Sequence, residues 1–224
     1  MRNGAIIASI AASIATMPMT SALAQVPPDY EVRELERGDI ESIQSAQPFA
    51  DCLVRQKAKE IPKYLGTLSA NIEWVARDMS KAHPECPAPK KLGKDATFFL
   101  QTALLEALIK RDFGNTAPPA NFSHLPPFRY VKGDSDFTKE WFANLIDPYD
   151  CVSRREPAKV QALLATQPLS TEEGVALGNL KATLVACQPK GEKWELRAHF
   201  ARHYLAETYY TLMRVDQRKN ASAH

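Results

Sequence analysis

The chain contains one short sequence twice, each time around a cysteine. DCLVR occupies residues 51–55 and DCVSR residues 150–154, and the 224 residues include only 4 cysteines. The other two cysteines, Cys86 and Cys187, follow these sequences at similar distances. Repetition of this kind restricts the fold strongly, because each copy must form one structural unit that packs against the other.

The two copies align along most of their length. With Cys86 placed on Cys187, residues 85–113 and 186–214 run without a gap. The matched positions are Phe99 with Phe200, Leu104 with Leu205, Glu106 with Glu207, and, at the first cysteines, Cys52 with Cys151 and Arg55 with Arg154. We therefore predict one module of about 75 residues that is used twice.

Both modules are predicted to be helical. In the second, the expected helices run from Asp147-Pro148 through Arg155, from Pro157 to about Ala165, from a capping box at Ser170 and Glu173 to near Ala186, and from about Glu192 to Arg218. No segment alternates apolar and polar residues long enough to indicate a strand. The predicted fold class is all-α, with two tandem modules that are each closed by one disulfide.

The first module follows the same plan more loosely. Pro48 is expected to open a short helix, Ser69 to cap the third, and the fourth to run from about Gly93 to Phe113. A short helix over 137–146 should lead into the second module, and residues 29–46 should supply its counterpart before the first.

The N-terminus has the pattern of a signal peptide. A basic start at Arg2 is followed by an apolar stretch from Gly4 to about Thr16 and by Ala22-Leu23-Ala24, which fits an A-x-A cleavage site. The apolar stretch is shorter than the roughly 20 residues of a membrane-spanning helix. We expect a soluble mature chain that begins near Gln25 and lies in the periplasm or outside the cell.

The remaining divisions follow from proline content and the repeat. They are residues 1–24 as signal peptide, 25–47 as a lead-in, 48–113 as module 1, 114–136 as a proline-rich segment, 137–219 as module 2 and 220–224 as a tail. Segment 114–136 is interpreted either as a connector laid across the two modules or as a surface loop. Its aromatic residues, which include Phe122, would suit docking onto a neighbouring surface.

Composition argues against two classes of protein. The chain has 28 basic and 26 acidic residues with both signs interspersed, so it lacks the positive stripe of a nucleic-acid-binding protein. A hydrophobic content of 45% excludes wholesale disorder. Sequence motifs for a serine nucleophile, a phosphate-binding loop or a dinucleotide site are also missing.

The predicted export indicates whether the cysteines are free or bonded. An even number of cysteines in an oxidising compartment is expected to form disulfides, and only Cys52–Cys86 and Cys151–Cys187 respect the repeat. These bonds would use every thiol, which argues against a cysteine nucleophile or a cysteine-bound zinc. We predict no cofactor and no bound metal.

The second module resembles a known family. DCVSRREPAKVQALL, STEEGVALGNLKATLVACQPKGEKWELR and LAETYY look like uncharacterised exported bacterial proteins whose modules read Cys-Val-x-x-Arg, a mid-module cysteine and a closing Leu-Ala-Glu helix. The resemblance implies the architecture and export, and it carries no activity. The family places Arg-Gly just before Leu-Ala-Glu, whereas Gln101-Thr102 and Arg202-His203 stand in this chain.

One group of residues could form a metal-binding or catalytic site. His199, His203 and Glu207 share a helix face, and two histidines four residues apart can hold a divalent metal. Phe200 occupies the position where a metalloprotease would have its glutamate. The matching residues in the first module are Phe98, Thr102 and Glu106, so packing of the histidines at a helix seam, or a contact with a partner or ligand, are the alternatives.

The repeated arginines suggest two ion pairs. Glu106 and Glu207 lie between two apolar stripes of their helices, which predicts at least partial burial. A buried carboxylate needs a partner, so we predict the pairs Arg55–Glu106 and Arg154–Glu207 within the modules. The alternative is that both glutamates are solvated.

The sequence names no substrate and no catalytic residue. We expect a binding protein that acts on a protein or small-molecule partner in the cell envelope. The alternative is an enzyme that uses His199, His203 and Glu207 in a cleft between the modules, for example in metal-assisted hydrolysis.

Overall fold

The described part of the chain contains helices and no strand. The computed structural model describes residues 37–57, 61, 79–89, 96–126, 145–188 and 198–222. Its helices are α1 (Arg37–Lys57), α4 (Ala96–Phe113), α6 (Asp147–Arg155), α7 (Pro157–Leu164), α8 (Thr171–Ala186) and α9 (Ala198–Ser222). The all-α prediction is confirmed. The predicted signal peptide, the Ser69 cap and nearly all of the helix expected over 137–146 lie outside the described residues.

The described helices give no sign of a membrane span. Within the part of the chain that the structure describes, each helix is either too short or too polar to cross a bilayer.

Helix α1 differs from the prediction, because it runs unbroken through Pro48. A proline inside a helix removes a hydrogen bond and costs about 3 kcal/mol. However, the ring of Pro48 is exposed, and the apolar stripe continues past it from Ile43 through Phe49 to Leu53, which are all buried. Packing of this stripe outweighs the local cost, so one helix replaces the two short ones that were expected around Pro48.

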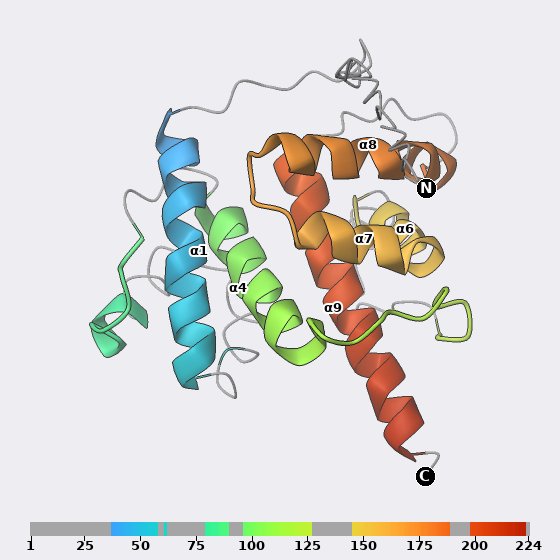
Figure 1. Ribbon diagram of the computed structural model, residues 1–224, viewed down its shortest axis with the longest axis horizontal. Helices are drawn as coiled ribbons and strands as arrows, with labels where there is room; N and C mark the ends of the chain where they lie inside the picture. The colour runs from blue at the N-terminus through green and yellow to red at the C-terminus, as the bar shows by residue number, and fades with distance from the viewer. Residues whose placement is uncertain are drawn as a thin grey trace, which may run out of the picture.

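Helices α4 and α9 lie side by side at the centre of the molecule (Figure 1). Helix α1 packs on the far side of α4, while α6 and α7 pack on α9. Residues 102–109 of α4 are all buried, which is typical of a helix that is covered on several faces. The core is continuous across both modules, and its fully buried members include Leu53, Leu104 and Leu205.

Local sequence signals place the helices of the second module. Pro148 and Pro157 lie in the first turns of α6 and α7, where the missing N–H costs nothing. Ser170 caps α8 by accepting a hydrogen bond from the backbone N–H of Glu173 at 3.1 Å. The predicted boundaries of these three helices are therefore confirmed to within about one residue.

Residues 114–126 follow α4 without forming a helix and lie against the second module. Phe122 is fully buried beside Tyr209, with ring centroids 6.4 Å apart. Its backbone N–H donates to the carbonyl of Arg154 at 2.9 Å. This half of the proline-rich segment is a connector that is packed on its own chain, which agrees with the first of the two predicted interpretations.

Candidate functional site

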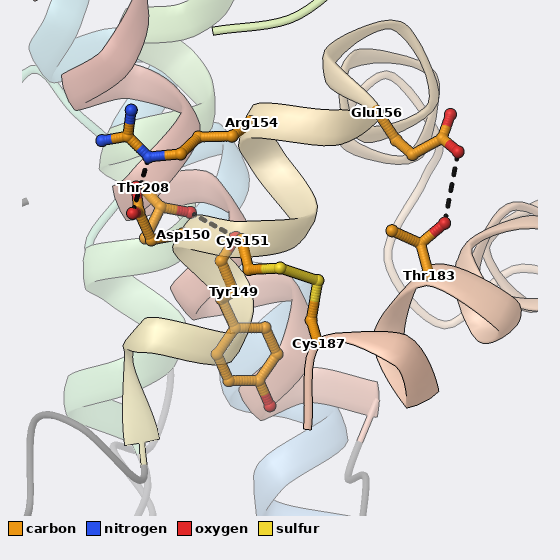
Figure 2. The surroundings of a disulfide bond; sticks show 8 residues. All are labelled: Tyr149, Asp150, Cys151, Arg154, Glu156, Thr183, Cys187 and Thr208. Carbon is orange, nitrogen blue, oxygen red and sulfur yellow. Dashed lines mark hydrogen bonds and ion pairs between the residues drawn. A yellow bond between two sulfur atoms is a disulfide. The ribbon is translucent and has the colours of Figure 1, made fainter. Parts of the chain in front are cut away.

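The two predicted disulfides are present. Cys52 is bonded to Cys86, and Cys151 to Cys187. In the second module the bond joins α6 to the end of α8, as Figure 2 shows. Thr183 donates a hydrogen bond to Glu156 at 3.2 Å and links the same two parts of the chain. The prediction that each module is closed by its own disulfide is confirmed.

The face formed by His199, His203 and Glu207 is mainly a packing seam between α9 and α4. The ring of His199 lies 5.7 Å from that of Phe99, and the ring of His203 lies 5.1 Å from that of Phe98. His203 is 5% exposed, whereas the side chain of Glu207 is 36% exposed. Among the described residues, no group of three or more His, Cys, Asp or Glu side chains is arranged to hold a metal.

Burial keeps His203 neutral. It lowers the pKa of the imidazole from 6.5 to about 3. The Thr102 hydroxyl donates to the Phe98 carbonyl at 2.6 Å and lies 3.0 Å from His203 Nδ1. Because a hydroxyl has only one hydrogen, Thr102 can only accept from the ring, so Nδ1 carries the proton. The unprotonated Nε2 then faces Glu207 Oε2 at 4.0 Å.

Helices α4 and α9 face each other with equivalent residues. Thr102 and His203 occupy the same place in the repeat, and they are hydrogen-bonded to each other. Phe98 is equivalent to His199 in the repeat, and Phe200 is equivalent to Phe99. The ring contact of Phe98 with Phe200, at 5.0 Å, is matched by the ring contact of His199 with Phe99, at 5.7 Å. The interface therefore follows an approximate two-fold axis, like the isologous interface of a symmetric dimer.

Glu106 is buried, as predicted, but its partner is Arg202 of the other module. Arg202 Nε donates to Glu106 Oε1, and Nη1 donates to Glu173 Oε1 at 2.9 Å. The guanidinium also donates to Thr166, both to the carbonyl at 2.8 Å and to the hydroxyl at 3.1 Å. One arginine thus joins α4, α9, α8 and the turn between α7 and α8.

The predicted Arg55–Glu106 pair is wrong. The two-fold arrangement brings Glu106 against the other module, and Arg55 is exposed on α1. Burial raises the pKa of Glu106, an effect that Arg202 partly offsets. Burial lowers the pKa of Arg202, but Glu106 and Glu173 outweigh it, so the net shift is upward and the arginine stays charged.

The predicted Arg154–Glu207 pair is also wrong. Arg154 Nε donates to Asp150 Oδ2 at 2.7 Å, one helical turn away (Figure 2). Its two Nη atoms donate to the carbonyls of Phe122, Leu125 and Pro126. The arginine therefore fastens the connector to α6, with four of its five N–H groups bound to Asp150 and the connector carbonyls and none to Glu207.

Sequence reasoning missed Arg202. Its agreement with the first residue of an Arg-Gly pair in similar sequences predicts no contact. A better signal lies in its spacing, because Ala198, Arg202, Leu205 and Tyr209 form one stripe along α9. Arg202, Leu205 and Tyr209 are all buried, and an arginine on such a stripe must find carboxylates or carbonyls nearby.

Helix α8 exposes two large apolar side chains on its outer face. Val175 is 50% exposed and Val185 is 55% exposed, and Leu169 in the preceding turn is 41% exposed. Gly174 and Gly178 lie in the same helix, and a Cβ atom at either position would meet nothing within 4 Å apart from its chain neighbours and the backbone of its own helix. The fold itself therefore does not require these two glycines, although each costs about 1 kcal/mol relative to alanine in a helix.

The turn before α8 is held in a strained conformation. Leu169 has a φ of 65°, which is unfavourable for a residue with a branched side chain. Its N–H donates to Glu173 Oε2 at 2.6 Å, and Glu173 in turn accepts from Arg202. The buried ion cluster thus fixes an exposed leucine at the edge of the α8 face.

Comparisons of the chain with protein-family models, curated proteins and solved structures gave no match.

Proposed function

We propose that this is an exported binding protein whose partner is another protein that docks on the outer face of α8. The observation that carries this proposal is the exposure of Val175 and Val185 on one helix, with Leu169 beside its start. Exposed apolar side chains that gather on one element are typical of interaction surfaces. A convex helix face suits a protein surface, whereas small molecules bind in concave sites.

Three further features support the proposal. Gly174 and Gly178 would let a partner backbone approach α8 closely, which gives these otherwise unfavourable residues a role. The strained Leu169 is held in place by Glu173, and strain of this kind concentrates at functional sites. The signal-peptide pattern and the disulfides support export.

The enzyme alternative receives less support from the geometry. His203 is buried, and with a pKa of about 3 it is a weak base at neutral pH. His199 packs against the Phe200 ring at 4.4 Å. A binding function therefore accounts for more of the described residues.

The test uses a photo-crosslinking residue in place of Val175 in the mature chain, with Ala158 as the matched control. Ala158 is exposed on α7, outside the proposed surface. After illumination in an envelope extract of the source cells, we expect one protein adduct at position 175 and none at 158. Val185→Lys should abolish that adduct. Equal labelling at the two positions, or labelling that survives Val185→Lys, would refute the proposal.

Gly178→Ala separates binding from folding. It should stabilise the free protein by about 1 kcal/mol, because alanine is the better helix former and its Cβ meets nothing. The same change should weaken capture of the partner at position 175, because the methyl group stands between the two surfaces. A stabilised variant with unchanged capture would show that the glycines play no part in docking.

A further inference from the structure

The approximate two-fold axis relates two glutamates that have different surroundings. Glu106 on α4 and Glu207 on α9 occupy the same position in the repeat. Glu106 receives the guanidinium of Arg202 from the opposing helix. Exchanging the copies places Gln101 opposite Glu207, because Gln101 is the counterpart of Arg202. The same carboxylate position is therefore paired with a guanidinium on one side of the axis, whereas the residue that corresponds to this arginine on the other side is a neutral amide.

The surroundings of Glu207 include the phenol of Tyr204, whose pKa Glu207 helps to raise, and the ring of His203, but no cation among the described residues. Its only ion-pair neighbour within the described residues is His203, whose Nε2 lies 4.0 Å from Oε2. The hydrogen bond to Thr102 places the ring proton on Nδ1, so Nε2 presents a lone pair toward the carboxylate. Two acceptors at this separation can share one donor group, with donor-to-acceptor distances of about 2.8–2.9 Å in each hydrogen bond.

Glu207 is accessible to a ligand. Its side chain is 36% exposed, compared with 5% for Glu106. Partial burial still raises the pKa of the Glu207 carboxyl, so an ionised Glu207 would gain from a cationic partner. The Glu106 side of the axis shows which group suits this position, since it holds a guanidinium there.

We propose that Glu207 and His203 Nε2 form a binding site for a guanidinium or primary ammonium group that comes from outside the chain. The group would donate one hydrogen bond to the Glu207 carboxylate and one to Nε2, with Gln101 beside it. This site lies on α9 and α4 and does not depend on the proposed docking surface of α8.

The experiment is an NMR titration of the mature protein with labelled Glu207 and His203 side chains. The probes are N-acetyl-arginine amide and agmatine, which separate an arginine side chain of a partner from a free guanidine. N-acetyl-citrulline amide is the neutral control, because it has nearly the same shape without the charge. We expect saturable shifts at His203 Nε2 and the Glu207 carboxyl with at least one charged probe and none with citrulline.

Three variants make the result decisive. Glu207→Gln should abolish the shifts at His203, whereas Glu172→Gln, an exposed glutamate on α8, should leave them unchanged. Gln101→Arg should fill the site from within the chain, abolish probe binding and raise the melting temperature. The proposal is overturned if neither charged probe gives saturable shifts, if citrulline binds equally well, or if Gln101→Arg leaves binding unchanged.

Discussion

At the scale of single residues, burial decides the behaviour of groups that look reactive in the sequence. His203 has the spacing of a metal ligand, yet the seam between α4 and α9 makes it a neutral residue that is hydrogen-bonded to Thr102. The spacing along one helix shows which residues share a face. It does not show which helix covers that face, and the covering helix sets the pKa.

This burial predicts an acid-sensitive contribution to stability. The pKa of His203 is about 3 in the folded protein, compared with 6.5 for an unperturbed histidine such as that of the unfolded chain. The unfolded chain therefore binds the proton more tightly. The contribution of neutral His203 to the free energy of unfolding is fully present above pH 6.5. It is lost as the pH falls toward 3. Between pH 7.5 and pH 5 the loss should be about 2 kcal/mol.

The measurement is urea unfolding of the wild type and His203→Gln at several pH values. The free energy of unfolding of the wild type should fall relative to that of the variant by this amount on acidification. Parallel pH profiles for the two proteins would show that His203 titrates alike in the folded and unfolded states.

At the scale of elements, the sequence predicts best where a local signal acts alone. The prolines at the starts of α6 and α7 and the Ser170 cap of α8 place those helices correctly. Pro48 misleads because the packing of α1 on α4 outweighs its local effect. The partners of Arg154 could not be found either, because three of them are backbone carbonyls of the connector.

The connector contacts predict a role for Arg154 that the exposed Arg155 does not share. Arg154→Ala removes one ion pair and three hydrogen bonds to carbonyls of residues 122–126. Charge-assisted hydrogen bonds contribute about 1.5–3 kcal/mol each when partly buried, and the loop can regain some of them from water. We expect a loss of about 2 kcal/mol and faster amide exchange in residues 122–126.

Arg155→Ala is the matched control, since it removes a neighbouring arginine that is exposed on the same helix. Equal losses of stability for the two variants, with unchanged exchange in the connector, would contradict the assigned role of Arg154.

At the scale of the whole molecule, the duplicated sequence forms one body with a shared core. The repeat correctly predicts two modules and both disulfides, because those features repeat within each copy. It cannot predict that equivalent faces of α4 and α9 pack together, since a repeat gives the same sequence pattern whether its copies face each other or lie apart. The repeat therefore does not indicate that the partner of Glu106 comes from the other module.

Arg202 and its two carboxylates join the modules. The most direct test is the free energy of unfolding of Arg202→Met, measured by urea denaturation, with Arg155→Met as the control. Removal of the guanidinium leaves Glu106 and Glu173 buried without their cation, which should cost about 3–5 kcal/mol. We expect this loss for Arg202→Met and less than about 0.5 kcal/mol for Arg155→Met. A loss at Arg202 that is as small as the loss at Arg155 would contradict this expectation.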